Sequence, residues 1–161
     1  MEDHPRIRLA LVWTQVFVAV TAVAGGVALA IGSLSTELMT LLSPPAEYLA
    51  GSPFGSYLVP GLILAVVLGG VHVAAFVAVV RLSGSALVLS AAAGYATLIW
   101  IFVQMMFIPF SPLQLLYFAV GSFELGLVML LLGLLPTRGT LHRAADARAD
   151  RGLGGSAAFE R

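Results

Sequence analysis

Two ionisable side chains stand inside stretches of the sequence that are otherwise almost entirely apolar. Glu124 lies in the segment GSFELGL, and His72 lies in the segment LGGVHVAA. A charge at the bilayer centre costs roughly 2.5 to 3.5 kcal/mol on insertion scales, so such residues usually face the protein interior and have a partner. An acid and a base in this setting can exchange a proton, bind a ligand or join two helices. Glu124 and His72 are therefore the leading candidates for an intramembrane functional site.

Two interpretations of Glu124 are nearly balanced. In the structural one, Glu124 is protonated or bonded to His72 and holds two helices together. In the functional one, it is a proton-coupled or ligand-binding carboxylate. For His72 alone the structural interpretation is favoured, because a single histidine on a packing face commonly just finds a partner.

Four further polar residues are secondary candidates: Gln15, Gln104, Gln114 and Tyr117. Gln15 and Gln104 each share a helical face with small residues, which favours interhelical hydrogen bonds over ligand contacts. Gln114 and Tyr117 come early in the last apolar stretch, where Tyr117 fits an interfacial aromatic belt. The alternative is a groove between Gln104, Gln114 and Tyr117 that binds a lipid or a quinone.

Glycines one or three turns from these residues predict close helix packing. Gly121 shares a face with Glu124, while Gly61 and Gly69 share a face with His72. At 1.5 Å per helical residue, His72 lies roughly 22 Å and Glu124 roughly 16 Å from the same end of their helices. The depths agree to within about 6 Å, so a contact between them is compatible with this arrangement, directly or through water.

The composition is that of an integral membrane protein. Of 161 residues, 60% are hydrophobic and 10% are charged, and the mean hydropathy is +1.01. The chain has no cysteine, which excludes disulfides, thiolate metal sites and cysteine nucleophiles. One intramembrane histidine and one glutamate fall short of a metal or haem site. We expect no cofactor, no metal and no nucleic-acid partner.

Four apolar stretches are long enough to cross a bilayer, which takes about 20 helical residues. The sequence predicts an all-α fold of four transmembrane helices in an antiparallel bundle, over residues 9–31, 57–80, 86–108 and 113–135. Short connections after the second and third stretches, RLSGS and PFSP, force antiparallel neighbours. The longer connection, residues 32–56, contains SPPAEYL. It predicts a short helix with Ser43 as N-cap and Pro44 in the first turn, ending near Gly51.

The arginines predict the orientation. All eight basic residues other than histidine are Arg: Arg6, Arg8, Arg81, Arg138, Arg143, Arg148, Arg151 and Arg161. They lie on one side of the predicted membrane and none lies on the other, a strong positive-inside signal. We therefore expect a transmembrane domain over 1–135 with both termini cytoplasmic, an outer loop over 32–56, and a disordered cytoplasmic tail over 136–161.

Two segments carry a family resemblance. SYLVPGLILAVVLGG together with WIFVQMMFIPFSPLQLLYFAVG resembles a group of small, uncharacterised four-helix integral membrane proteins of high-GC bacteria. The resemblance covers most of the second to fourth apolar stretches. It implies a multi-pass protein of a bacterial plasma membrane and specifies no activity.

Three functions follow in order of preference. The first is a structural or accessory membrane bundle without catalytic activity, either homo-oligomeric or joined to a membrane protein partner. The second is a small proton-coupled carrier that uses Glu124 and His72. The third is a membrane enzyme, or a binder of lipid or quinone. In each case the lipid bilayer is the surrounding partner.

Overall fold

The computed structural model describes residues 4–134, and the predicted tail at 136–161 lies outside this range. Within it, the fold is helical, with no strand. Four helices are long and apolar enough to cross a membrane: Pro5–Gly32, Leu58–Val80, Ala86–Phe107 and Pro112–Leu131. The architecture is therefore that of a multi-pass membrane protein. The boundaries agree with the predicted stretches to within four residues at each end.

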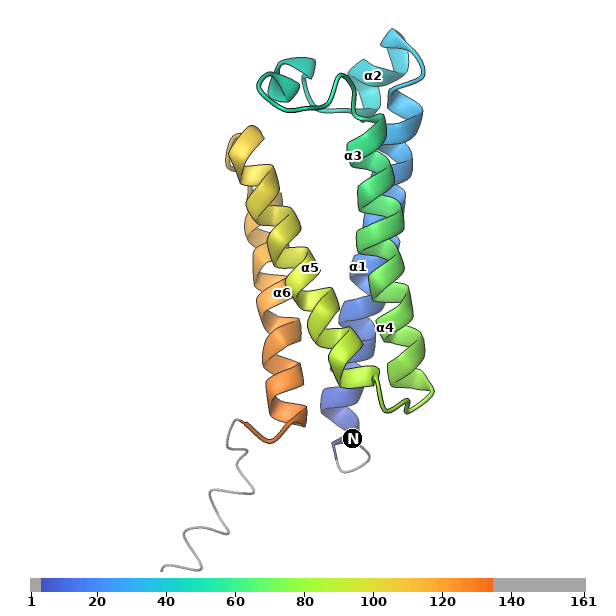
Figure 1. The fold of residues 1–161 in the computed structure, drawn as a ribbon, viewed down its shortest axis with the longest axis vertical. Helices are drawn as coiled ribbons and strands as arrows, with labels where there is room; N and C mark the ends of the chain where they lie inside the picture. Colours follow the sequence, from blue (N-terminus) through green and yellow to red (C-terminus); the bar gives the residue numbers. More distant parts are fainter. Residues whose placement is uncertain (1–3, 135–161) are drawn as a thin grey trace, which may run out of the picture.

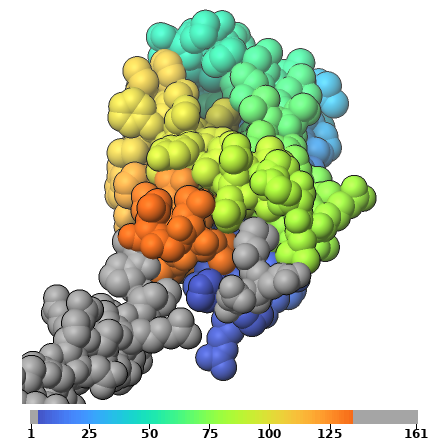
Figure 2. Space-filling view, turned by 60° about the horizontal axis from the view of Figure 1, so that its bottom comes forward, coloured from blue at the N-terminus to red at the C-terminus, as the bar shows by residue number. Residues whose placement is uncertain are grey.

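The four long helices lie roughly side by side, and their connections alternate between the two ends of the molecule (Figure 1). Helix α1 (Pro5–Gly32) starts at the lower end of this view, where α4 (Gly70–Val80) also turns into α5 (Ala86–Phe107). Helix α6 (Pro112–Leu131) starts at the upper end and returns to the lower one. Figure 2 brings the lower end forward and shows the start of α1 beside the end of α6.

Packing contacts place the helices at the corners of a square. Helix α1 packs against α4 and α6, and α5 packs against the same two helices. Helices α4 and α6 are therefore diagonal to each other, as are α1 and α5. Side chains that join diagonal helices must meet in the centre of the bundle, where all four helices exclude lipid.

The second long helix is not a regular α-helix, although the sequence predicts one continuous span. It comprises α3 (Leu58–Leu62), a π-helical segment η2 (Ile63–Gly69) and α4. Such wider turns are rare and often lie at functional sites. The sequence carries no signal for this change, because every residue of η2 is apolar or glycine and the segment shows no periodic pattern.

The last helix ends earlier than predicted, at Leu131 instead of residue 135. Gly133 has a φ of +71°. The Leu134 amide donates to the Met129 carbonyl at 3.0 Å, and the Gly133 amide donates to the Leu130 carbonyl at 3.1 Å. This pair of bonds is a Schellman motif, which terminates the helix at a glycine while the sequence remains apolar.

The connection between the first two spans holds two short helices, where the sequence predicts one. Helix α2 (Thr36–Leu42) has Ser35 as its N-cap, and the Ser35 side chain accepts from the Leu38 amide at 3.2 Å. Ser43 follows α2 as its C-cap, so the prediction of Ser43 as an N-cap is wrong. A 3₁₀ turn, η1 (Ala46–Leu49), begins after Pro45 instead of at Pro44. The two consecutive prolines favour extended backbone before the turn, which delays its start.

Glycines allow α1 and the second span to touch backbone to backbone. A Cβ atom on Gly61 would lie 2.7 Å from the Gly26 carbonyl oxygen, and one on Gly69 would lie 2.8 Å from a methyl of Val23. On the other side of the bundle, Gly121 of α6 faces Thr97 of α5, where a Cβ would lie 3.2 Å from the threonine side chain. Each of the three glycines singled out in the sequence thus lies at a helix crossing.

We predict that Gly61→Ala destabilises the bundle by about 1–3 kcal/mol, because the new methyl would force α1 and α3 apart. Gly126→Ala is the matched control, since no atom lies within 4 Å of its Cβ position. Alanine there should be neutral or stabilising, because it has the higher helix propensity. Thermal unfolding in detergent measures both. Equal melting temperatures for the two variants would contradict the close crossing.

Candidate functional site

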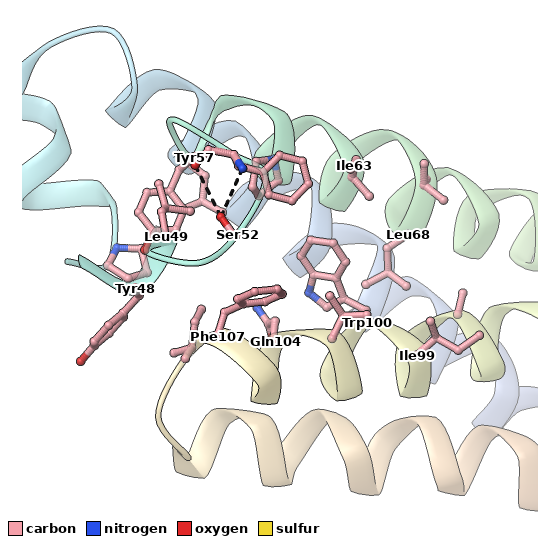
Figure 3. A pocket seen from close by; sticks show the side chains of 18 residues that line it. Tyr48, Leu49, Ser52, Tyr57, Ile63, Leu68, Ile99, Trp100, Gln104 and Phe107 are labelled. Carbon is pink, nitrogen blue, oxygen red and sulfur yellow. Dashed lines mark hydrogen bonds between the residues drawn. The ribbon is translucent and has the colours of Figure 1, made fainter. Parts of the chain in front are cut away.

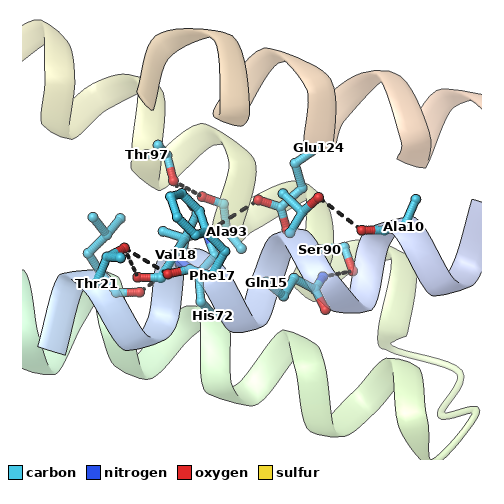
Figure 4. A network of polar contacts seen from close by, with 12 residues as sticks. Ala10, Gln15, Phe17, Val18, Thr21, His72, Ser90, Ala93, Thr97 and Glu124 are labelled. Carbon is cyan, nitrogen blue, oxygen red and sulfur yellow. Dashed lines mark hydrogen bonds and ion pairs between the residues drawn. The ribbon is translucent and has the colours of Figure 1, made fainter. Parts of the chain in front are cut away.

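The bundle centre holds the two ionisable residues that the sequence singles out, in contact with each other. His72 of α4 and Glu124 of α6 are both fully buried. The His72 Nε2 atom lies 3.3 Å from Glu124 Oε2, and Figure 4 shows the two side chains converging between the helices. Since α4 and α6 are diagonal, this contact crosses the whole bundle. What this pair can do beyond joining the two helices depends on where its protons lie.

The tautomer of His72 follows from its second contact. The Nδ1 atom lies 2.8 Å from the Leu68 carbonyl oxygen, one turn earlier in the same span. A carbonyl oxygen only accepts hydrogen bonds, so Nδ1 carries a proton. The remaining nitrogen, Nε2, then either accepts a hydrogen bond from a protonated Glu124 or donates one to a carboxylate. The two side chains together therefore share a single proton between Nε2 and Oε2.

Counting hydrogen bonds favours the neutral arrangement of this pair. Glu124 Oε1 is buried and has no partner within the described residues. In a carboxylate that oxygen would carry part of a buried, unpaired charge, whereas in a carboxylic acid it is a neutral carbonyl. With the proton on Oε2, the acid donates to Nε2 and both imidazole nitrogens are satisfied. We therefore describe the pair as an acid donating to a neutral imidazole.

Thr97 of α5 supplies an alternative partner for His72. Its hydroxyl lies 3.3 Å from His72 Nε2 and 3.2 Å from the Ala93 carbonyl oxygen. When the imidazole is neutral, the hydroxyl donates to Ala93; when Nε2 carries a proton, the hydroxyl oxygen can also accept from it. Thr97 thus accommodates both protonation states of the pair: it donates to Ala93 in either state, and it accepts a hydrogen bond from His72 only when Nε2 carries a proton.

A second polar link crosses the other diagonal. Gln15 of α1 donates from Nε2 to the Ser90 hydroxyl of α5 at 2.8 Å, and Ser90 donates to the Ala86 carbonyl at 2.8 Å. Gln15 and Ser90 are fully buried, and Gln15 Oε1 has no partner in the described part of the chain. Gln15 therefore makes the interhelical hydrogen bond that its position suggested, as Figure 4 also shows.

The other three secondary candidates do not meet in one groove. Gln114 is buried at the start of α6, where its side chain accepts from the Ser111 amide at 2.9 Å in a capping box. Tyr117 stacks on Phe17 of α1 with ring centroids 6.1 Å apart. Gln104 instead lines a pocket between α5 and the second span.

That pocket has a volume of about 490 Å³ and lies between α3–η2, α5 and the loop above them. Ile63, Val67 and Leu68 line one wall, and Trp100, Gln104 and Phe107 of α5 line the facing wall, as Figure 3 shows for most of them. Loop residues form its cover: Pro44, Tyr48, Leu49, Ser52 and Phe54. The lining is overwhelmingly apolar and aromatic.

Tyr57 fixes the loop over the pocket. Its side chain is 4% exposed, and its hydroxyl donates to the Pro45 carbonyl at 2.9 Å. Burial raises the pKa of Tyr57 above its ordinary value, and the neighbouring Tyr48 raises it further. The phenol therefore stays protonated at neutral pH and keeps donating this bond. Because proton loss is disfavoured in the folded state, the contribution of this bond to stability is lost only at alkaline pH.

The pocket and the central pair are adjoining parts of one region. Leu68 lines the pocket with its side chain and accepts from His72 with its carbonyl. Ala96 lines the same pocket, and the next residue, Thr97, contacts His72 on the other side. His72 itself does not line the pocket.

Sequence reasoning missed several residues of this region. Leu68 and Trp100 are apolar or aromatic residues in apolar helices, so their types carry no signal without the fold. Thr97 and Ser90 had a usable signal, because they share the Gln104 face of the same helix at helical spacing. Within residues 4–134, no three metal-ligating side chains lie together.

Comparison with known proteins adds nothing to this geometry. No protein-family model, no curated protein and no solved structure matches the chain. The interpretation therefore rests on the described residues alone.

We predict that His72→Leu lowers the free energy of unfolding by about 1–3 kcal/mol, because it leaves the Glu124 carboxyl buried without a partner. The double variant His72→Leu/Glu124→Leu should recover much of this loss, since replacing both partners by apolar groups is nearly neutral. Chemical unfolding of both variants and of Glu124→Leu in detergent gives the coupling free energy. A double variant whose loss equals the sum of the single losses would mean that the two side chains do not interact.

Proposed function

We propose that this protein is a bacterial plasma-membrane protein that binds an apolar chain of a membrane lipid in the pocket between α3–η2 and α5. The proposed topology is an antiparallel four-helix bundle with both termini cytoplasmic, supported by the distribution of the arginines. This topology puts the pocket in the outer leaflet, at the end that carries α2 and η1. No chemical conversion is part of the proposal.

The observation that carries it is the pocket itself. Its volume of about 490 Å³ lies within the range of small-molecule sites, roughly 300–1,000 Å³. An empty apolar space of this size would forfeit the dispersion contacts of all the side chains around it. Val67, Ile99 and Val103 line it and are 54%, 63% and 41% exposed. Because these residues face the bilayer, the pocket opens sideways toward lipid.

This proposal places lipid binding above the structural or accessory role expected from the sequence. Where helices only pack together, their side chains and backbones fill the space between them, as those of α1 and α3 do at Gly26 and Gly61. The facing walls of α3–η2 and α5 are instead held apart under a loop that Tyr57 fastens down. An accessory role for a partner membrane protein, or self-association, remains compatible with lipid binding at this site.

We predict that the fluorescence of Trp100 reports pocket occupancy. Trp13→Phe leaves Trp100 as the sole tryptophan, and acyl chains brominated near its depth should quench it in liposomes. Adding Ala96→Phe places a phenyl ring in the pocket, which should displace the acyl chain and reduce the quenching. Ala92→Phe is the matched control, because Ala92 lies one turn earlier on α5, is exposed and does not line the pocket.

Two results would contradict lipid binding. Ala96→Phe and Ala92→Phe could change the quenching equally, which would mean that the pocket holds no chain. Trp100 could also be quenched less than the lipid-facing Trp13, measured in a Trp100→Phe variant, in every lipid tested. In that case protein, such as a second copy of the chain, would fill the pocket.

A second candidate function is proton-coupled transport, favoured by one specific observation. His72 Nε2 lies 3.3 Å from both Glu124 Oε2 and Thr97 Oγ1, so a proton on either His72 or Glu124 has an acceptor. A site that holds a proton in two arrangements is the minimum that a proton-coupled carrier needs in the membrane interior. Among the described residues, the elements around the pair bring no other acid or base into contact with it.

For this candidate we predict that the infrared band of the Glu124 carboxyl exchanges readily with deuterated water, because a carrier must give this proton access to an aqueous side. The protein is measured in liposomes, and Glu124→Gln assigns the band by removing it. A band that stays shielded from exchange would leave the pair as a link between helices. The lipid-binding proposal would be unaffected by that result.

A further inference from the structure

We infer that the pocket selects an uncharged lipid, one with apolar chains and a small headgroup of hydroxyl and ester carbonyl groups, as in a diacylglycerol. This inference rests on the proposed lipid binding and deepens it by naming the chemical class of the ligand. Three features of the described residues carry it: the absence of charge in the lining, the sign of the charge beside the cover, and two uncommitted polar groups on α5.

The pocket wall offers no cation to a phosphate. None of the 18 lining residues is charged, and none is a histidine. Burying a charged group without a partner is far more costly than burying a neutral polar one. An anionic or zwitterionic headgroup drawn into this space would have to give up water for an apolar, aromatic surface. An uncharged headgroup gives up much less.

The nearest charge at the cover is negative. Glu47 is exposed on η1, directly before the lining residues Tyr48 and Leu49. The loop that spans residues 33–57 contains no arginine, lysine or histidine. Within residues 4–134, the arginines Arg6, Arg8 and Arg81 lie at the opposite end of the bundle. A phosphate at the cover would therefore meet a like charge with no cation near it.

Two polar side chains of α5 are free to bind a neutral headgroup. Trp100 and Gln104 are four residues apart, so they lie on one face of the helix about 6 Å apart along its axis. Both reach into the pocket, as Figure 3 shows, and neither makes a side-chain hydrogen bond within the described residues. The indole N–H donates, and the amide both donates and accepts. A carbonyl and a hydroxyl of one headgroup satisfy both.

The experiment compares lipids that share the same brominated chains and differ only in the headgroup. In the Trp13→Phe background, diacylglycerol should quench Trp100 at about a tenfold lower mole fraction than phosphatidylglycerol, because the latter brings a charge beside Glu47. Phosphatidylethanolamine should also be weaker than diacylglycerol, since its phosphate is unpaired in the pocket. Gln104→Leu should weaken the diacylglycerol effect roughly three- to tenfold, the value of one hydrogen bond.

A charge reversal tests the electrostatic part separately. Glu47→Arg should bring phosphatidylglycerol close to diacylglycerol, whereas Glu37→Arg on α2 should not, because neither Glu37 nor its sequence neighbours line the pocket. Equal quenching by all three lipids, or preference for either phospholipid, would overturn this inference and leave lipid binding standing. Quenching that Ala96→Phe does not reduce for any lipid would overturn lipid binding as well.

Discussion

The contact between His72 and Glu124 is the constraint around which this bundle is organised. Inside a bilayer, polar side chains have no water with which to form hydrogen bonds, so each must find its partner within the protein. The two residues lie on diagonal helices, and they can meet only if α4 and α6 both turn these faces to the centre. Gln15 and Ser90 impose the same condition on α1 and α5. Two crossed links thereby fix the rotation of four helices whose surfaces are otherwise similarly apolar.

The rotation set by these links explains why the helices are packed unequally. With Gln15 directed inward, Gly26 of α1 faces Gly61, and the two backbones come into contact. With Ser90 and Thr97 directed inward, the adjacent face of α5 presents Trp100 and Phe107 to the second span. Small residues bring α1 and the second span into contact, and large aromatic residues of α5 keep α5 and the second span apart. The pocket is thus a consequence of the same rotation that satisfies the polar centre.

The two candidate activities occupy neighbouring volumes with opposite chemistry. The pocket is apolar and is covered by a loop, which suits a hydrocarbon chain. The centre is polar and holds the buried contact between His72 and Glu124. Leu68 belongs to both, through its side chain on one side and its carbonyl on the other. Leu68 lies in the π-helical segment η2, so the irregular part of the second span borders both the pocket and the polar centre.

The sequence by itself determined the number, the approximate ends and the membrane character of the long helices, because length and hydropathy are properties of each segment alone. It also selected Glu124, His72 and the packing glycines, since a polar or very small residue is conspicuous in an apolar stretch. It missed the early end of α6 at Gly133 and the π-helical turn, where hydrogen bonding changes while the apolar pattern continues.

Only the tertiary structure decided which faces meet. An apolar helix in lipid is apolar on all sides, so its sequence pattern leaves its rotation about its own axis undetermined. A groove between Gln104, Gln114 and Tyr117 was therefore as consistent with the sequence as the pocket that formed. The diagonal contacts between residues 52 and 75 positions apart settle that rotation. The pocket follows from this rotation, and for that reason the sequence did not predict its aromatic wall.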